Sequence, residues 1–489
     1  MSLNLISDAW IPVLDQHGAR RLIAPWQMAD ARLSFPDWPR ADLNIACLEL
    51  LIGLVFMADP PADLGDWITR QPPDPDRLRE RLAPFAPAFN LLGDGPLFLQ
   101  DLEKLEGEPN PPDMLFIDSA GANAAKNNAD LMVHRARYPS LDLPLAAMAL
   151  FAFQAHAPAG GAGNRTSMRG GGPLVTLVDP GQGLWSLIWA NVPEGTPGKP
   201  ADLPWTRATR VSDKGAETLP PTKAPSVEAF FGMPRRLRLI GEAAVNGVVQ
   251  KPWGTNYAFW THPLTPYYRQ KPGTELLPVH PRAGIFGYRH WLGILAEVGQ
   301  DGLRDLATCL RDWDSRSKET GAAAKVILAG WAMDNMKPRD FTWSVQPMVD
   351  LSPEGTDSLR GMIQAAEQAA LALRSALEPV LAGGEAREAE REAFYQATEA
   401  AFLSHFAALK GGAAVAEAWL ADLSAQAMRQ FDALALPGLD QRETDRIEAI
   451  VKARGYLGAA FKGYGAYGDK IFTALELTKP EKPKKGKAA

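Results

Sequence analysis

The chain has 489 residues, of which 46% are hydrophobic and 22% charged, and its formal net charge is −6. This length and composition predict a globular protein of roughly two to four domains with a large core. The lack of an apolar run of about 18 residues excludes a membrane span, and the first eight residues lack the basic and apolar parts of a secretory signal. The two cysteines, Cys47 and Cys309, exclude a disulfide framework and a thiolate zinc site. We therefore expect a cytoplasmic protein with no membrane partner.

Charge is distributed unevenly along the chain. Residues 1–117 carry a net charge of −9, residues 118–171 a net charge of +2, and residues 205–272 a net charge of +6. Such segregation can create a local positive surface on an acidic protein, and a positive surface attracts phosphate. The alternative is that arginine and lysine are scattered over a large surface.

The N-terminal part of the chain predicts short strands and helices. Apolar residues recur at helical spacing over 42–58, and Asp59-Pro-Pro61 ends this helix because proline lacks an amide donor. We expect strands over residues 3–6, 10–13 and 21–23, and helices over residues 42–58, 74–82 and 145–155.

Two segments between these elements are unusual. Residues 107–144 are rich in proline, asparagine and small residues, and are long for a connection inside a compact domain. Residues 159–172 contain six glycines. Each segment is either disordered or functional.

Residues 174–347 mix short strands with proline-rich connections. We expect strands over residues 174–178, 184–188, 325–329 and 341–345, and a helix over residues 289–295. The many tryptophans of this region are expected mainly in the core.

The chain changes character after Ser352. Residues 356–382, 385–409, 413–435 and 439–460 are amphipathic stretches separated by Gly-Gly or Pro-Gly, which predicts a four-helix bundle. The expected fold class is therefore α+β. A large mixed domain with short strands and long loops (1–352) precedes an all-α four-helix bundle (353–475) and a basic, flexible tail (476–489).

The sequence offers no convincing catalytic constellation. The seven histidines form no HxxxH or HExxH pair, and the phosphate-binding loop and nucleophile-elbow patterns are both absent. We expect neither a cofactor nor a metal.

Three features remain that core packing does not explain. The glycine segment could press backbone against a nucleic acid, with Arg165 and Arg169 beside it as phosphate contacts, or could be a flexible surface loop. Arg235-Arg236-Leu237-Arg238, followed by Gln250-Lys251-Pro252-Trp253, fits a strand with one basic face or a solvated strand. Met333-Asp-Asn-Met-Lys-Pro338 is either a plain turn or a wedge that separates base pairs.

Together these features resemble one family. The opening Asn4-Leu-Ile-Ser-Asp-Ala-Trp-Ile-Pro-Val13, the stretch Met168-Arg-Gly-Gly-Gly-Pro173, and Trp260-Thr-His-Pro263 are similar to motifs of CasA. CasA is the large subunit of the type I-E CRISPR Cascade complex. The resemblance spans essentially the whole chain.

The resemblance implies a non-catalytic subunit that reads the protospacer-adjacent motif (PAM) in double-stranded DNA and starts strand separation. The implied partners are the CRISPR RNA 5′ handle, target DNA, other Cascade subunits and the helicase-nuclease that it helps to recruit. Relatives read the motif with a glycine loop, a lysine finger and a wedge. By local matching the loop is Ala159, Gly160, Gly161, Ala162 and Gly163, the finger is Lys251, and the wedge is Asp334, Asn335 and Met336.

The chain departs from the family pattern in three places. Asn335 stands where relatives can carry glutamine, and the cysteine cluster that some relatives carry before the lysine finger is missing. The loop from Ser119 to His134 takes the place of the loop that touches the RNA handle but matches it poorly. Lys126, Asn127 and Asn128 are the expected RNA contacts there.

Two other functions stay open on the residues alone. One is an enzyme of unknown class with a site around His262, His280 and His290. The other is a helical-bundle interaction protein whose N-terminal domain is only a scaffold.

Overall fold

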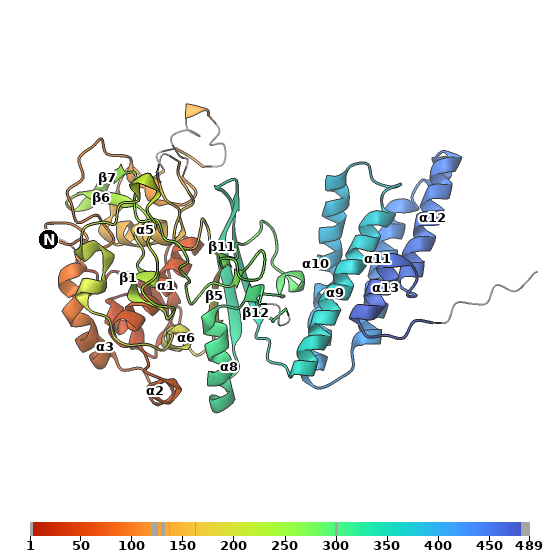
Figure 1. Cartoon of the computed structure of the whole chain (residues 1–489), viewed down its shortest axis with the longest axis horizontal. Helices are drawn as coiled ribbons and strands as arrows, with labels where there is room; N and C mark the ends of the chain where they lie inside the picture. The colour runs from red at the N-terminus through yellow and green to blue at the C-terminus, as the bar shows by residue number, and fades with distance from the viewer. Residues whose placement is uncertain are drawn as a thin grey trace, which may run out of the picture. The chain divides into compact units, whose positions relative to one another are not determined.

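The computed structural model describes residues 3–119, 121, 126–128, 133–135, 137–161, 163–298 and 302–480. Two compact units make up the chain (Figure 1). Unit 1 comprises residues 1–285 and 301–348, and unit 2 comprises residues 286–300 and 349–489. The sequence placed the boundary at residue 352 and assigned residues 286–300 to the first domain, whereas their contacts join them to unit 2.

Two apolar helices form the core of unit 1. Helix α1 (Ala41–Ala58) packs against α5 (Leu143–His156), and both are buried over nearly their whole length. By length and composition α1 could span a membrane, but 89% of it is buried inside the protein, as a core helix is. Asp142 caps α5 by accepting a hydrogen bond from the backbone N–H of Leu145 at 2.8 Å.

The described strands of unit 1 form four small antiparallel sheets, each with three strands. Their orders are β2 (Arg20–Ile23), β1 (Ile11–Asp15), β3 (Leu33–Pro36); β4 (Leu141–Asp142), β7 (Ala244–Lys251), β6 (Arg236–Gly241); β12 (Lys337–Pro347), β11 (Lys325–Asp334), β5 (Val175–Asp179); and β10 (Arg304–Asp305), β8 (Tyr267–Tyr268), β9 (Leu277–Pro278). The strand predicted at residues 236–238 is β6, and the two strands predicted in 325–345 are the arms of one long hairpin, β11–β12.

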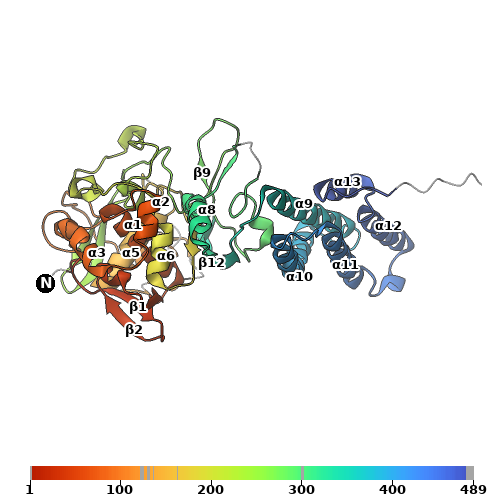
Figure 2. The same cartoon turned by 90° about the horizontal axis from the view of Figure 1, so that it is seen from below.

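The remaining helices of unit 1 are shorter. They are α2 (Leu64–Thr69), α3 (Pro75–Leu82), α6 (Leu184–Asn191), α7 (Val227–Phe230) and α8 (Thr308–Thr320). In Figure 2, α3, α5 and α6 lie near α1.

Three elements predicted from the sequence were wrong. The strand expected at 184–188 is the helix α6, in which Trp185 and Trp189 stack at 5.4 Å, one helical turn apart. Periodicity cannot separate strand from helix in so short an apolar run. The strand expected at 3–6 is reduced to one bridge at Asn4, and the helix expected at 289–295 to one 3-10 turn, Tyr288–His290.

The described residues of unit 2 contain the four predicted helices and a fifth helix that was not predicted. They are α9 (Pro353–Ala376), α10 (Gly384–Lys410), α11 (Ala416–Ala435), α12 (Thr444–Ala460) and α13 (Gly465–Ala474). Helix α9 contacts all four others, and its buried alanines allow close approach. Tyr288 joins this unit because its ring stacks on Phe402 at 4.2 Å and its hydroxyl bonds to Thr398 at 2.8 Å.

Candidate nucleic-acid interface

The glycine-rich residues 159–172 belong to a closed loop, residues 157–172, that begins directly after α5 and is called the glycine segment from here on. At its base the N–H of Ser167 donates to the carbonyl of Ala157, and the N–H of Gly172 donates to the carbonyl of His156, each at 2.9 Å. At its tip the N–H of Gly160 donates to the carbonyl of Asn164 at 3.1 Å. Ala159, Gly160 and Gly161 are exposed at this tip, and Ala162 lies outside the described residues.

Gly163 brings this loop against the end of β7. Its φ is +81°, and a Cβ there would lie 2.8 Å from the indole ring of Trp253. The N–H of Trp253 donates to the carbonyl of Gly163 at 2.9 Å, and the Gln250 amide donates to the Asn164 side chain at 3.0 Å. Glycine is required here both for the backbone conformation and for the close approach.

Lys251 is therefore next to the glycine segment. It is the last residue of β7 and is exposed. The end of its side chain passes Gly107, where a Cβ would lie 3.7 Å from Nζ. The end of β7 that carries Lys251 thus adjoins the glycine loop through Gln250 and Trp253, and the Lys251 side chain itself extends toward Gly107.

Trp253 is a surface residue, whereas the tryptophans of this region were expected mainly in the core. It is 39% exposed and adopts a φ of +67°, a conformation that bulky residues rarely adopt. The guanidinium of Arg165 lies 5.3 Å from the centre of its ring and is held by the hydroxyl and the carbonyl of Ser212, each at 2.8 Å. A tryptophan two residues after a candidate lysine was the available signal, but most tryptophans were assigned to the core.

Arg235 supports the tip of the loop from the interior. Its guanidinium bonds to the carbonyl of Pro158 and lies 5.1 Å from the ring centre of Phe153. Burial lowers the pKa of Arg235 to about 10, which leaves it charged at neutral pH. A Cβ on Gly160 would lie 3.0 Å from this guanidinium.

Arg169 does not fit the predicted contact with phosphate. It is 3% exposed, and its Nη1 donates to Glu49 Oε1 at 2.5 Å and to Thr265 Oγ1 at 3.2 Å. His156 donates from Nε2 to Glu49 Oε2 at 2.6 Å. Burial alone would raise the pKa of Glu49, but the positive field of Arg169 and the His156 contact outweigh it and hold the pKa well below its ordinary value. Arg169 is an internal partner of Glu49 because the loop base is enclosed.

The predicted wedge is the turn of the β11–β12 hairpin. Asp334 and Lys337 are opposite each other in the strand register at the two ends of the turn. Asn335 and Met336 between them have φ values of +48° and +63°. Positive φ at both central residues is the type I′ pattern that favours tight hairpins. Met336 is 53% exposed. Asp334 accepts hydrogen bonds from Asn335 at 3.0 Å and from Arg339 at 2.8 Å, so the turn is held by its own residues.

The wedge hairpin contacts the glycine segment at the segment's far end. A Cβ on Gly172 would lie 2.3 Å from the carbonyl oxygen of Trp331 and 3.0 Å from the methyl group of Met333. In Figure 1 the turn of the hairpin lies toward the upper end of unit 1, as β6 and β7 do. The strand that carries the wedge therefore packs directly on the segment that carries the loop.

The three expected RNA contacts, Lys126, Asn127 and Asn128, are exposed. Asp118 lies just before the loop that contains them. Its Oδ1 accepts hydrogen bonds from Nη2 of Arg137, which follows the loop, at 2.9 Å and from Nη2 of Arg40 at 3.0 Å. Burial would raise the pKa of Asp118, but these arginines outweigh it and lower the pKa.

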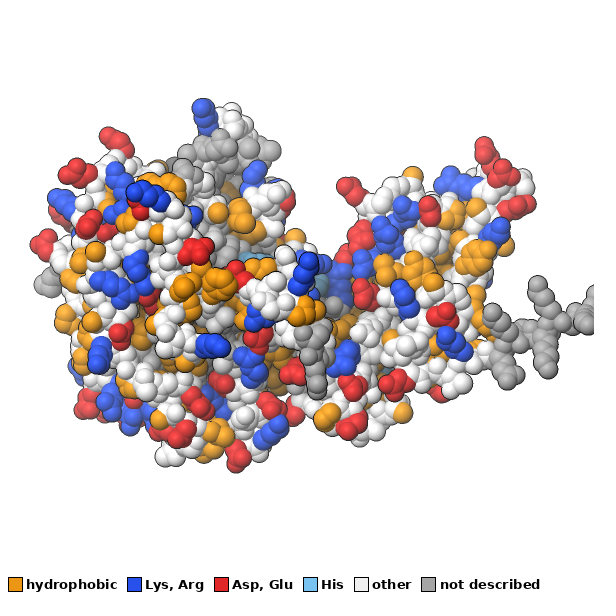
Figure 3. Space-filling view, in the orientation of Figure 1, with side chains coloured by type: hydrophobic (Ala, Val, Ile, Leu, Met, Phe, Trp, Pro, Cys, Tyr) orange, Lys and Arg blue, Asp and Glu red, His pale blue; other side chains and the backbone are white. Residues whose placement is uncertain are grey.

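The basic strand is not a free cationic face. Arg236 bonds to the buried carboxylate of Asp101 at 2.6 Å, and Arg238 bonds to the carbonyl of Asp101 at 3.1 Å. Arg207 and Arg210 both pair with Glu228. On the face shown in Figure 3, positive and negative side chains of unit 1 are interspersed. Arg207, Arg210 and Arg236 are therefore engaged in ion pairs, and of these pairs only the one with Asp101 offsets the net positive charge of residues 205–272.

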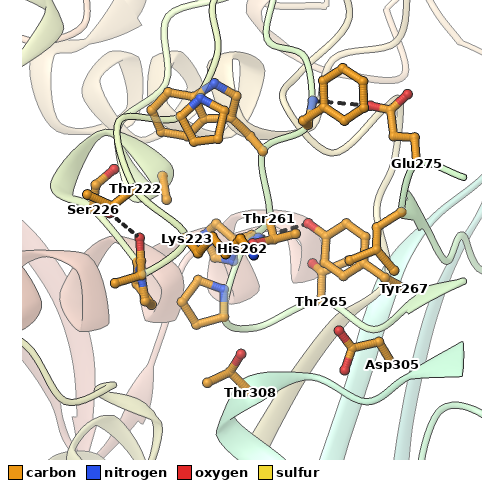
Figure 4. A pocket seen from close by; sticks show the side chains of 18 of the residues that line it. Thr222, Lys223, Ser226, Thr261, His262, Thr265, Tyr267, Glu275, Asp305 and Thr308 are labelled. Carbon is orange, nitrogen blue, oxygen red and sulfur yellow. Dashed lines mark hydrogen bonds between the residues drawn. The ribbon is translucent and has the colours of Figure 1, made fainter. Parts of the chain in front are cut away.

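The histidines of the enzyme alternative do not line one described pocket together. A pocket of about 730 Å³ is lined by His262, Thr265 and Tyr267 (Figure 4), and His262 alone of the three histidines lines it. Burial, reinforced by Arg169, holds the pKa of His262 well below its ordinary value. His280 bonds to the carbonyl of Gly172 at 3.2 Å, and His290 belongs to unit 2. Within the described ranges, no three histidine, cysteine, aspartate or glutamate side chains are grouped to hold a metal ion.

Comparison with known proteins gives one consistent result. Residues 4–430 match the model of the CRISPR-associated protein Cse1 family. CasA of Thermus thermophilus is 19% identical with a TM-score of 0.74, over 94% of this chain and 99% of that one. Cse1 of Thermobifida fusca is 18% identical with a TM-score of 0.70, over 97% and 98%. A chain of a CRISPR RNA-guided surveillance complex is 16% identical with a TM-score of 0.67, over 93% and 99%. The mixed fold with a helical C-terminal part, predicted from the sequence, is confirmed.

Proposed function

The chain belongs to the Cse1 (CasA) family of CRISPR-associated proteins, and we propose that it is the non-catalytic subunit of a type I-E Cascade complex that reads the PAM in double-stranded DNA. In this role it acts in the cytoplasm, beside the other Cascade subunits and the 5′ handle of the CRISPR RNA. Its exposed Lys126, Asn127 and Asn128 face that RNA.

One observation carries the proposal. The exposed glycine tip and the exposed Lys251 belong to segments that are joined by the bond from the Trp253 N–H to the Gly163 carbonyl. The tip presents bare backbone at Gly160 and Gly161, and Lys251 supplies an exposed ammonium group from the adjoining end of β7, where its side chain passes Gly107. Trp253 adds an exposed aromatic face to the same surface.

This combination suits the minor groove of DNA. The groove edges offer mainly acceptors, plus the amino group of guanine, so a backbone and one lysine distinguish few sequences. The expected result is promiscuous recognition of several short motifs. The guide RNA then supplies the sequence specificity, in the division of labour described for another RNA-guided effector.

The β11–β12 turn supplies the second step. Met336 and Asn335 stand at the end of a long hairpin, and we expect them to enter the base stack next to the motif. Unstacking a base step costs about a few kcal/mol, which contacts to the DNA backbone and pairing with the guide offset. Opened DNA is then available to the helicase-nuclease, which this subunit helps to recruit.

The test is duplex binding by the reconstituted complex, with targets that do or do not carry a motif. We expect motif-dependent binding that Lys251→Ala weakens by roughly 1–3 kcal/mol. Lys271→Ala, which removes another exposed lysine of unit 1, is the matched control. Equal losses from the two variants would show that Lys251 contributes only general positive charge, and binding that ignores the motif in the unmodified complex would overturn the proposal.

A further inference from the structure

Glu49 is a carboxylate in the centre of an apolar helix. It lies in the middle of α1, is 1% exposed, and receives hydrogen bonds from Arg169 at 2.5 Å and from His156 at 2.6 Å. A buried ion pair of this kind often stabilises a protein no more than a packed apolar side chain would. Stability alone therefore does not explain a charge at this position.

The two partners of Glu49 are at opposite ends of the reading loop. His156 is the last residue of α5, directly before the glycine segment, and Arg169 is in the part of the segment that returns to the core. One carboxylate thus holds both ends. The backbone bonds Ser167 to Ala157 and Gly172 to His156 lie beside this contact.

The loop needs such an anchor because of its composition. Its exposed tip contains Gly160 and Gly161, which lose more conformational entropy on ordering than any other residue type. The tip also lacks the large apolar side chains that would fix it by burial. Its geometry must therefore be imposed by the contacts of Arg235 and Trp253 near the tip and by the contacts at the base.

We propose that Glu49 is a positioning residue, which fastens both ends of the glycine segment and so holds it in the conformation that discriminates motif-bearing DNA. This inference rests on the proposed function. Glu49 does not touch DNA and acts only through Arg169, His156 and the loop between them.

Asp59 offers a matched control on the same helix. It is the C-cap of α1 and is buried. Its Oδ2 accepts hydrogen bonds from Arg70 Nη2 at 2.5 Å and from Arg77 Nε at 2.8 Å. Both arginines belong to the neighbourhood of α2 and α3, not to the glycine segment. Glu49→Gln and Asp59→Asn therefore each remove one buried charge that basic side chains surround, and only the first releases the loop.

The first measurement is amide hydrogen exchange of the full chain without DNA. We expect the amides of Gly160, Ser167 and Gly172 to exchange roughly tenfold faster in Glu49→Gln than in Asp59→Asn, because local opening of the loop becomes easier. Equal exchange at these three amides in the two variants would overturn the anchoring role. This result does not depend on whether the chain reads DNA.

The second measurement is the ratio of affinities for duplexes with and without the motif, in the reconstituted complex. We expect this ratio to fall roughly tenfold in Glu49→Gln and to stay unchanged in Asp59→Asn. The reason is that Glu49 fastens the glycine segment, whereas Asp59 binds arginines in the neighbourhood of α2 and α3. An unchanged ratio in Glu49→Gln, with a loosened loop, would overturn the role in discrimination. If the unmodified complex binds duplexes with and without the motif equally well, the proposed function is contradicted instead.

A second variant covers the case in which Glu49→Gln does not fold. Glu49→Leu combined with Arg169→Met and His156→Leu replaces the whole buried group by apolar side chains, and such replacements keep or raise stability in other proteins. We expect a folded chain whose motif discrimination is still reduced. Full discrimination in this triple variant would show that the buried group serves stability alone.

Discussion

The tip of the glycine segment and the β11–β12 turn are both exposed, but different kinds of contact hold them in their conformations. The segment is held by residues from distant parts of the chain, namely Glu49, Arg235 and Trp253. The turn is held by its own residues, through positive φ at Asn335 and Met336 and through the bond from Asn335 to Asp334. A reading surface is thus built by tertiary contacts, whereas a wedge is built by local hairpin geometry.

This difference has a consequence for mutation. Changes far from the glycine segment should alter its function, because its geometry depends on the core. Changes to the hairpin turn should act only through the side chain that is changed. The three predictions below test this contrast.

The largest effect is expected from Gly163→Ala. An L-residue at positive φ costs roughly 1–2 kcal/mol, and contact of the new Cβ with the Trp253 ring adds about 1–3 kcal/mol of overpacking. Gly181→Ala is the control, because Gly181 also has positive φ, at +72°, nothing lies within 4 Å of its Cβ position, and it lies outside the glycine segment. Binding of motif-bearing duplex should fall more for Gly163→Ala. Similar losses would mean that the contact with Trp253 does not position the loop.

Met336→Gly separates the wedge from the turn. Glycine accepts the φ of +63° at this position, and Asn-Gly is a favoured type I′ pair, so the free energy of unfolding should change by less than about 1 kcal/mol. Strand opening, followed with a fluorescent base next to the motif, should slow, while duplex binding should persist. Normal opening in this variant would remove Met336 from the wedge.

The smallest expected effect is a change with pH in how much Glu49 contributes to the stability of the folded chain. The pKa of Glu49 in the folded chain lies below its ordinary value of 4.5, so the unfolded chain binds the proton first as the pH falls. The contribution of Glu49 is fully present above about 4.5 and decreases as the pH falls below that value. The difference in urea midpoint between the unmodified chain and Glu49→Gln should therefore shrink from pH 7 to pH 4. A constant difference would contradict the pairing of Glu49 with Arg169 and His156.

The sequence indicated the parts of the site but not what holds them. Gly160, Lys251 and Asn335 were selected because short motifs of the chain resemble those of one family, and such motifs are visible without a structure. Glu49 could not, because it is separated from His156 by 107 residues and from Arg169 by 120 residues. Arg169 was interpreted as a phosphate contact for the same reason, since nothing local shows that it points inward.

The fold was also predicted only in part from the sequence. Long periodic elements such as α1 and the helices α9 to α12 were found because their apolar spacing is regular. Short apolar runs were ambiguous, as the helix α6 shows. The place of residues 286–300 in unit 2 depends on Tyr288 and Trp291 packing on Phe402, a contact between distant segments.

The most direct test of the central claim, that the glycine tip and Lys251 form one DNA-reading surface, is photo-cross-linking from the tip. A photoreactive amino acid in place of the exposed Ala159 would be incorporated into the assembled complex and irradiated with labelled duplex. We predict cross-links to the motif base pairs and their immediate neighbours, which disappear when the motif is replaced. Cross-links that ignore the motif, or that lie only at a distance from it, would contradict the account.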